Sequence, residues 1–162
     1  MSRFCIVIAD GHRARFFSLH PAEFPATQPG PNLKEHESLL AEDTNRDLNA
    51  DRLRKSAGGP GRNDDSSVRD HQKEMERHFA MRIMDHAGEL LQIWDSKVAI
   101  LVADAHTLGL MRVHKLRLRE VQIREKVGDV THLNPLKLHA WLSDAGLIPA
   151  RHAPITLSPR GY

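Results

Sequence analysis

The sequence has little of several features that define specialised protein classes. A single cysteine, Cys5, excludes an intramolecular disulfide framework and any metal site built from several cysteines. The longest uninterrupted apolar run, Val98–Ala103, has six residues and is far too short to span a membrane. Asp10 interrupts the first apolar stretch, so the N-terminus lacks a signal-peptide pattern. We therefore expect a cytoplasmic protein without membrane insertion.

A charge excess of either sign is also nearly absent. The 162 residues include 23 Lys and Arg against 21 Asp and Glu, a formal net charge of +2. This balance argues against a polybasic coat protein, so any contact with nucleic acid must come from a local patch. Hydrophobic residues make up 40% of the chain, which is enough for one core. We expect a single domain over residues 1–148 and a tail over 149–162.

The order of the apolar segments predicts a mixed α/β fold. Asp10-Gly11 lies between apolar runs at 3–9 and 14–19, which predicts a β-hairpin with a positive φ in its turn. Further strands are expected over 33–40, at an edge, and over 98–103 and 122–127, and helices over 68–94, over 107–120 and from Asn134-Pro135 to near Gly146. The expected fold class is therefore a mixed β-sheet with an N-terminal hairpin and about three packed helices.

A long polar segment, residues 41–67, stands outside this pattern. Connections of this length within one domain are usually functional or disordered. Within it, Asp47 and Asp51 are outnumbered by the basic residues Arg46, Arg52, Arg54, Lys55 and Arg62. Guanidinium groups bind phosphates in bidentate geometry, and Gly58 and Gly59 would let the main chain approach closely. The segment therefore predicts contact with RNA phosphates, and a solvated connector is the alternative.

Two further arginines flank the expected hairpin turn. In a strand, Arg13 and Arg15 lie on one face, opposite Ala14 and Phe16. They could extend a phosphate-binding surface, or they could solvate the edge of the sheet. Both interpretations remain open at the level of the sequence.

Three aspartates, Asp10, Asp104 and Asp129, each follow an apolar strand. Carboxylates at the carboxyl ends of strands in an open α/β sheet can converge on a divalent metal, so a metal-dependent hydrolase or nuclease is an alternative. Each aspartate also has a local explanation, because Asp10 and Asp129 suit turns and Asp104 suits a helix cap. The eleven histidines show no His-x-x-x-His spacing, and we expect neither a metal nor another cofactor.

Four segments together resemble the bacterial host attachment proteins. Residues 6–17, IVIADGHRARFF, are similar to the family's opening A-D-G-x-R-A-R-x-F, and residues 100–103 with 108–112 resemble its strand followed by L-G-x-L-R. Residues 126–133 resemble its K-D-L-T stretch before the last helix, and 51–62 followed by a charged helix fits its layout. The resemblance covers residues 3–145 in the expected order.

This resemblance implies an RNase H-like sheet related to the middle domain of archaeal and eukaryotic peptide-release factors. In release factors, the loop before the long helix carries Gly-Gly-Gln and enters the peptidyl transferase centre of the ribosome. The equivalent position here is Gly58-Gly59-Pro60, so peptidyl-tRNA hydrolysis is not expected. The resemblance implies a non-enzymatic binding protein that contacts ribosomal RNA or tRNA. A regulatory or protein-interaction factor in host-cell attachment is the second alternative.

Overall fold

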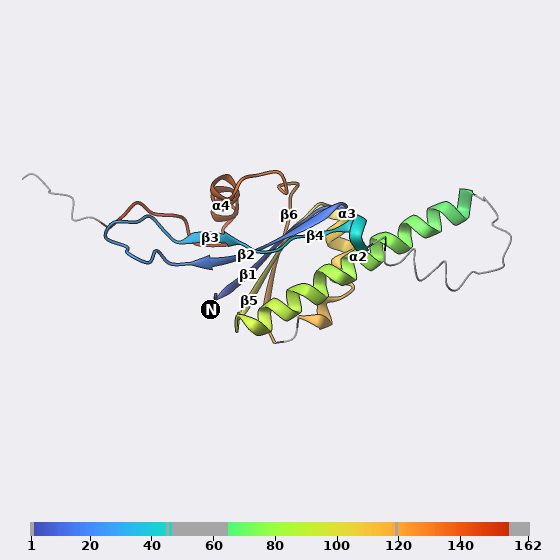
Figure 1. Cartoon of the computed structure of the whole chain (residues 1–162), viewed down its shortest axis with the longest axis horizontal. Coiled ribbons are helices and arrows are strands. Elements are labelled where there is room, and N and C mark those ends of the chain that lie inside the picture. Colours follow the sequence, from blue (N-terminus) through green and yellow to red (C-terminus); the bar gives the residue numbers. More distant parts are fainter. Residues whose placement is uncertain (1, 45, 47–64, 119, 156–162) are drawn as a thin grey trace, which may run out of the picture.

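The structure is a computed structural model that describes residues 2–44, 46, 65–118 and 120–155. In chain order its elements are β1 (Phe4–Ala9), β2 (Arg13–His20), β3 (Asn32–Glu35), β4 (Leu39–Leu40), α2 (Asp65–Ile93), β5 (Val98–Ala103), α3 (Ala105–Arg112), the 3-10 helix η1 (Lys115–Arg117), β6 (Gln122–Val127) and α4 (Pro135–Asp144) (Figure 1). Residues 41–44 form a short helical segment before α2. The fold is therefore a mixed α/β fold, as predicted.

The strands form one six-stranded sheet in the order β3-β2-β1-β5-β6, with β4 also paired to β2. Strands β1, β5 and β6 are parallel neighbours, whereas β2 is antiparallel to β1, β3 and β4. The expected N-terminal hairpin is thus confirmed, and the expected strand over 33–40 is two short strands on the outer edge of β2. Parallel strands in the centre of the sheet need both faces covered by helices.

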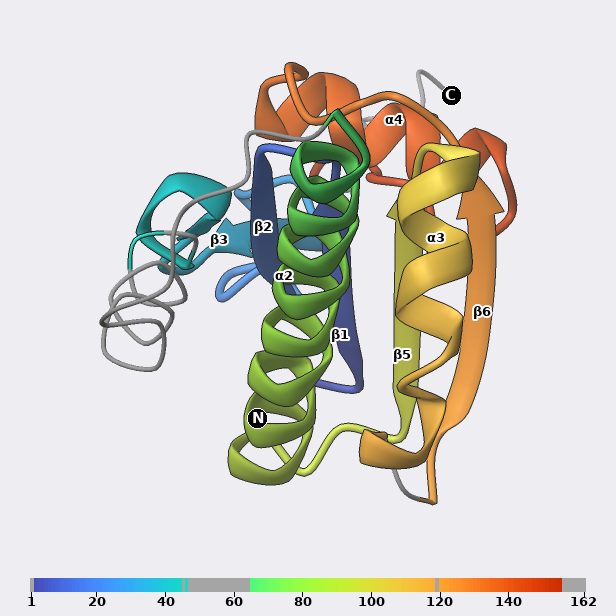
Figure 2. The ribbon, with the colours of Figure 1, turned by 90° about the vertical axis from the view of Figure 1, so that its right-hand side faces the viewer.

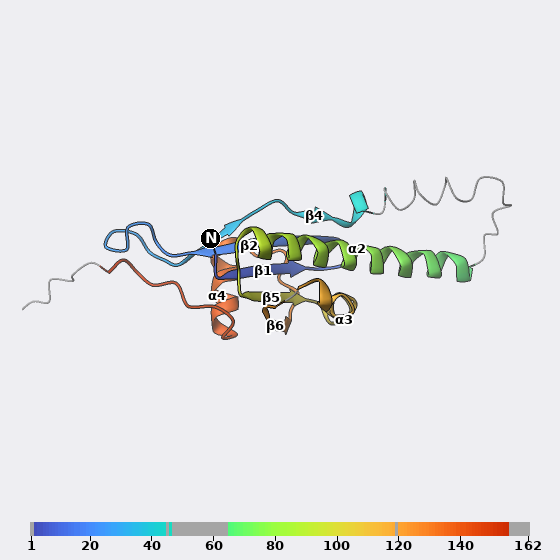
Figure 3. The same cartoon turned by 90° about the horizontal axis from the view of Figure 1, so that it is seen from below.

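Helices cover both faces of the sheet. In Figure 2, α2 and α3 lie on one side of the strands, and Figure 3 shows α4 across the opposite side. Alternate residues of each central strand point to opposite faces. The α2 face takes Cys5, Val7, Ala9, Ala99, Leu101 and Ala103, and the α4 face takes Phe4, Ile6, Ile8, Val98, Ile100 and Val102. Both sets are buried, so β1 and β5 are apolar along their whole length.

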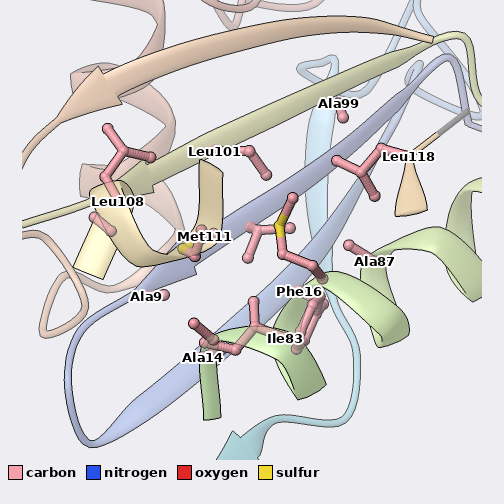
Figure 4. Close-up of a cluster of buried hydrophobic side chains, with 14 of the residues drawn as sticks. Ala9, Ala14, Phe16, Ile83, Ala87, Ala99, Leu101, Leu108, Met111 and Leu118 are labelled. Carbon is pink, nitrogen blue, oxygen red and sulfur yellow. The ribbon is translucent and has the colours of Figure 1, made fainter. Parts of the chain in front are cut away.

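Small side chains of the sheet let α2 and α3 approach it closely. Figure 4 shows Ala9 and Ala99 of the central strands in the same cluster as Ile83 of α2 and Met111 of α3. A helical glycine continues this close packing, because a Cβ at Gly88 would lie 2.7 Å from the backbone oxygen of Arg117. The backbone of α2 at Gly88 therefore lies against η1, and this contact has no space for a larger residue.

The hairpin turn is set by a side chain and not by glycine. The Asp10 carboxylate Oδ1 accepts hydrogen bonds from the backbone N–H groups of His12, at 2.7 Å, and Arg13, at 2.9 Å. Among the described glycines only Gly146 has a positive φ, so the expected positive φ at Gly11 is wrong. The side chain of Asp10 mimics a backbone turn, which removes the need for a left-handed residue.

The helices α3 and α4 begin at capping residues that the sequence suggests. Asp104 caps α3 by accepting the N–H of Thr107 at 3.1 Å, and Asn134 caps α4 before a proline in its first turn. The helix expected over 107–120 is shorter, because α3 ends at Arg112 and continues as η1. The long helix begins at Asp65, three residues before the expected start. None of the described helices is long and apolar enough to cross a membrane.

Part of the expected tail packs back onto the fold. Gly30 and His152 exchange two backbone hydrogen bonds, of 3.1 and 2.7 Å. The N–H of Ile155 then donates to the carbonyl oxygen of Pro25 at 2.8 Å. Residues 152–155 therefore extend along the loop between β2 and β3.

The contact between Gly128 and α4 gives a stability prediction. A Cβ at Gly128 would lie 2.6 Å from a ring atom of Trp141, whereas a Cβ at Gly109 in α3 meets nothing within 4 Å. We expect Gly128→Ala to lower the free energy of unfolding by about 1–3 kcal/mol through overpacking. The control Gly109→Ala should raise it by up to about 1 kcal/mol, because alanine favours helix. Urea unfolding measures both, and a fully stable Gly128→Ala variant would contradict the packing argument.

Candidate functional site

A cleft of about 1350 Å³ opens at the carboxyl ends of the parallel strands. It lies where β1 leads to β2 on one side and β5 leads through α3 to β6 on the other. Ligands of open α/β sheets bind in crevices at such reversals of strand order. The cleft is lined by Asp10, Gly11, His12, Arg13, Leu40, Ala41, Glu42, Arg46, Val68, His71, Gln72, Met75, Glu76, Phe79, Ala80, Asp104, His106, Thr107, Leu110 and Asp129.

The three strand-end aspartates all line this cleft but have different surroundings. Asp10 accepts a hydrogen bond of 2.6 Å from the Thr131 hydroxyl besides its two backbone donors. Asp104 is the cap of α3, and Asp129 is exposed. No group of three or more His, Cys, Asp or Glu side chains among the described residues could hold a metal ion. The geometry therefore gives the metal-dependent alternative no support in this part of the chain.

The carboxyl group of Asp10 is held in its charged form. Burial acts to raise its pKa, but the hydrogen bonds from Thr131 and from the N–H groups of His12 and Arg13 favour the carboxylate and outweigh burial. The pKa of Asp10 therefore lies below its ordinary value. A carboxylate with three donors is a structural anion and a poor general acid.

Arg15 is committed to the interior of the protein. Its side chain is 7% exposed and its Nη2 lies 2.6 Å from the Glu35 carboxylate. Its Nη1 donates to the carbonyl oxygens of Thr131, at 2.9 Å, and Leu133, at 2.6 Å. Its guanidinium also lies over the Phe17 ring, 4.9 Å from the centroid. Internal acceptors thus occupy the guanidinium that the sequence suggested for phosphate binding.

Arg13 shares the face and one partner of Arg15, as the alternation predicts. Its Nη2 also donates to the carbonyl oxygen of Thr131. Asp10, Arg13 and Arg15 therefore all bind the segment between β6 and α4, and we call these residues with Thr131 the hairpin clamp. Backbone carbonyls in a connection need such partners when strands and helices do not supply them.

The remaining predicted RNA-binding residues are mostly outside the described part of the chain. Arg46 is described, and its side chain is 72% exposed, 3.6 Å from Glu42 and 3.9 Å from Asp43. Exposed pairs of this kind are weak and exchange readily with other partners. The others, Arg52, Arg54, Lys55, Gly58, Gly59 and Arg62, lie outside the described residues.

Sequence reasoning missed the apolar and acidic wall of the cleft. Leu40 and Val68 line it and are 45% and 61% exposed. Glu76 lies 2.8 Å from Nε2 of His106 and joins α2 to α3 across the cleft. Val68 fits the helical spacing of the buried residues Phe79 and Ile83 but is itself exposed. In Figure 3 the first turns of α2 project beyond the ends of the strands, where the sheet cannot cover them.

A second polar cluster, also missed, lies outside the cleft. The hydroxyl of Ser18 is 2.7 Å from Nε2 of both His20 and His36, and the His36 ring lies 4.6 Å from that of Trp94. Burial and the charge of Lys34 lower the pKa of both histidines, which favours their neutral forms. Ser18 is 1% exposed, so it joins β2 to the segment after β3 and offers no nucleophile to a substrate.

Cys5 is the remaining chemically reactive side chain of the interior. It is fully buried in the cluster beneath α2, and burial raises the pKa of its thiol to about 12. A thiol with this pKa is protonated at neutral pH and is not a nucleophile.

Residues 5–142 match the family described as "Protein required for attachment to host cells". The chain belongs to the host attachment family. No curated protein sequence matches it at the significance required. The cleft and the hairpin clamp both lie within the matched residues. In this host attachment protein, the A-D-G-x-R-A-R motif and Thr131, far apart in sequence, bind each other directly.

The charged state of Asp10 gives a prediction for acid stability. Because its pKa is lowered in the folded protein, its contribution is complete above the pKa of unfolded Asp and is lost as the pH falls through the folded pKa. Asp10→Asn should cost about 1 kcal/mol in unfolding free energy at pH 7. This difference from the wild type should shrink below about pH 4.

Urea unfolding at neutral and acidic pH measures this effect. The matched control is Asp129→Asn, an exposed aspartate of the same cleft with no hydrogen bond or ion pair in the described part of the chain. It should leave stability unchanged at both pH values. A difference for Asp10→Asn that stays constant with pH would contradict the assignment.

Proposed function

We propose that this host attachment protein is a non-enzymatic binding protein that contacts ribosomal RNA or tRNA through its basic segment, residues 46–62. One observation carries the proposal. The segment contains five basic residues and only two acidic ones, and its described end, Arg46, is exposed and lines the cleft. In a chain of net charge +2, this is a local concentration of phosphate-binding groups.

The topology of the sheet supports an RNase H-like fold related to the release-factor middle domain. Strand β2 alone runs against the other strands, in the order β3-β2-β1-β5-β6. The basic segment precedes the long helix α2, as the Gly-Gly-Gln loop does in release factors. Since Gly58-Gly59-Pro60 lacks the glutamine, we propose binding without hydrolysis. A ribosomal partner places the protein in the cytoplasm.

The hairpin clamp removes Arg13 and Arg15 from the proposed RNA-binding surface. The guanidinium of Arg15 is buried on internal acceptors, and Arg13 shares the Thr131 carbonyl oxygen. Moving either group to a phosphate would remove one of the two donors of that oxygen, and moving Arg15 would also remove the donor of the Leu133 carbonyl oxygen. The proposal therefore rests on Arg46 and the basic residues that follow it.

Removal of the basic side chains tests the proposal. Replacing Arg52, Arg54, Lys55 and Arg62 together by alanine should lower the affinity for tRNA or ribosomal RNA at least tenfold. The slope of log affinity against log salt should fall by about one for each lost phosphate contact. Filter binding over a salt series measures both. As control, alanine replaces Lys97 and Arg112, which are exposed elsewhere. Unchanged affinity in the fourfold variant would refute RNA contact through this segment.

Sedimentation with ribosomes identifies the larger partner. The protein should co-migrate with ribosomes or a subunit through sucrose at low salt and dissociate at moderate salt, because phosphate contacts are salt-sensitive. The fourfold variant provides the control and should stay at the top of the gradient. Wild-type protein that stays there at both salts would remove the ribosome as partner.

A protein-interaction role is a second candidate, and the cleft favours it. Exposed apolar side chains such as Leu40 and Val68 beside a concave surface are typical of docking sites for other proteins. This role does not require RNA contact, so the two functions are tested separately. Titration with amphipathic peptides of opposite charge is the test for docking.

A further inference from the structure

We infer that the cleft docks a cationic, amphipathic segment of a partner protein. This inference rests on the second of the proposed functions and specifies the chemistry of the partner. The cleft combines exposed apolar side chains with an excess of carboxylates. A partner that satisfies both features must carry apolar and basic residues on neighbouring positions.

The charges that line the cleft are mostly negative. Five carboxylates, of Asp10, Glu42, Glu76, Asp104 and Asp129, face two guanidinium groups, of Arg13 and Arg46. The histidines His12, His71 and His106 complete the titratable groups of the lining. Among the described residues that line the cleft, the carboxylates therefore outnumber the guanidinium groups by three. This excess of negative charge on the described part of the lining attracts cations and repels RNA phosphates.

Three of the carboxylates are accessible to a partner. The side chain of Glu42 is 81% exposed and that of Glu76 is 33% exposed. Asp129 is exposed, and its carboxylate has no ion pair or hydrogen bond among the residues that the structure describes. The three come from the segment after β4, from α2 and from the turn after β6. Lysines or arginines entering the cleft would thus meet carboxylates on more than one wall.

The apolar groups of the cleft supply a hydrophobic surface between these charges. Leu40 and Val68 are 45% and 61% exposed, Met75 and Leu110 are partly buried, and Phe79 is 3% exposed. Methionine side chains adapt to varied apolar partners. An occupant would cover Leu40 and Val68 and gain the free energy of removing them from water.

The size of the cleft suits a peptide better than a small molecule. Its volume of about 1350 Å³ is larger than that of most small-molecule sites, which run from about 300 to 1,000 Å³. Side chains of α2 between Val68 and Ala80 line one side of the cleft, and Leu40, Ala41, Glu42 and Arg46 line another. An amphipathic helix in a groove uses apolar anchors at helical spacing, which matches a wall built from one face of a helix.

The test is a fluorescence anisotropy titration of the full chain with two peptides. The first is a Leu/Lys peptide with helical amphipathic spacing, and the second has Glu in place of every Lys. We expect the basic peptide to bind and the acidic one not to bind, with an affinity that falls as salt rises. Glu76→Gln and Asp129→Asn should each weaken binding up to about fivefold. Val68→Ser should weaken it about tenfold by removing an exposed apolar anchor.

A matched control uses the same helix away from the cleft. Glu89→Gln removes a carboxylate that is 71% exposed on α2 and does not line the cleft, so it should leave affinity unchanged. Circular dichroism confirms that each variant is folded. Equal changes for Glu89→Gln and Glu76→Gln would overturn the assignment to the cleft.

The remaining outcomes separate the inference from the function on which it rests. Equal binding of both peptides, weakened by Val68→Ser, keeps protein docking at the cleft and overturns the cationic partner. Binding of neither peptide overturns both. If Val68→Ser weakens RNA binding and leaves peptide binding unchanged, RNA occupies the cleft and the inference is wrong.

Discussion

The carbonyl oxygen of Thr131 is the point on which the arrangement of the sheet edge depends. It accepts from Arg13 and Arg15, while the hydroxyl of the same residue donates to Asp10, which itself sets the hairpin turn. The connection between β6 and α4 is thereby fixed to the hairpin of β1 and β2, which lies on the other side of β5. Charge-assisted hydrogen bonds in a partly buried network are stronger than neutral ones. Asp10 and Arg13, which also line the cleft, are fixed in position by this network.

Much of the fold follows from patterns that are local in the sequence. These patterns include the continuous apolar runs of β1 and β5, the Asp10-Gly11 turn and the helix caps at Asp104 and Asn134. Each depends only on residues that are close together in the sequence. The site does not follow from local patterns, because the backbone acceptors of Arg15 lie in a distant segment. The alternation of residues along the strand does not show whether Arg15 points to solvent or to Thr131. The length of α2 could have shown from the sequence that Val68 lies beyond the sheet and is exposed. The 29 residues of α2 extend about 43 Å and six-residue strands about 20 Å, so half of the helix cannot lie on the sheet.

The family motif mainly makes contacts within the protein, although Asp10 and Arg13 also line the cleft. The residues that identify the family, around Asp10 and Thr131, spend most of their hydrogen-bonding capacity on each other. The exposed groups of the cleft, Glu42, Val68 and Asp129, surround them without taking part in that network. The hairpin clamp and the exposed groups of the cleft thus have different roles in the structure.

The sequence separation of the hairpin clamp also has a consequence for the order in which the protein is made. Arg15 lies 116 residues before Thr131 and 118 before Leu133, so these two carbonyl acceptors leave the ribosome long after the hairpin does. At ordinary rates of synthesis the interval is on the order of ten seconds. During that time the described partners of the guanidinium that are already translated are the Glu35 carboxylate and the Phe17 ring, and water must satisfy its remaining N–H groups. The hairpin clamp therefore forms only after residues 131–133 have been translated, when the segment before α4 binds the hairpin.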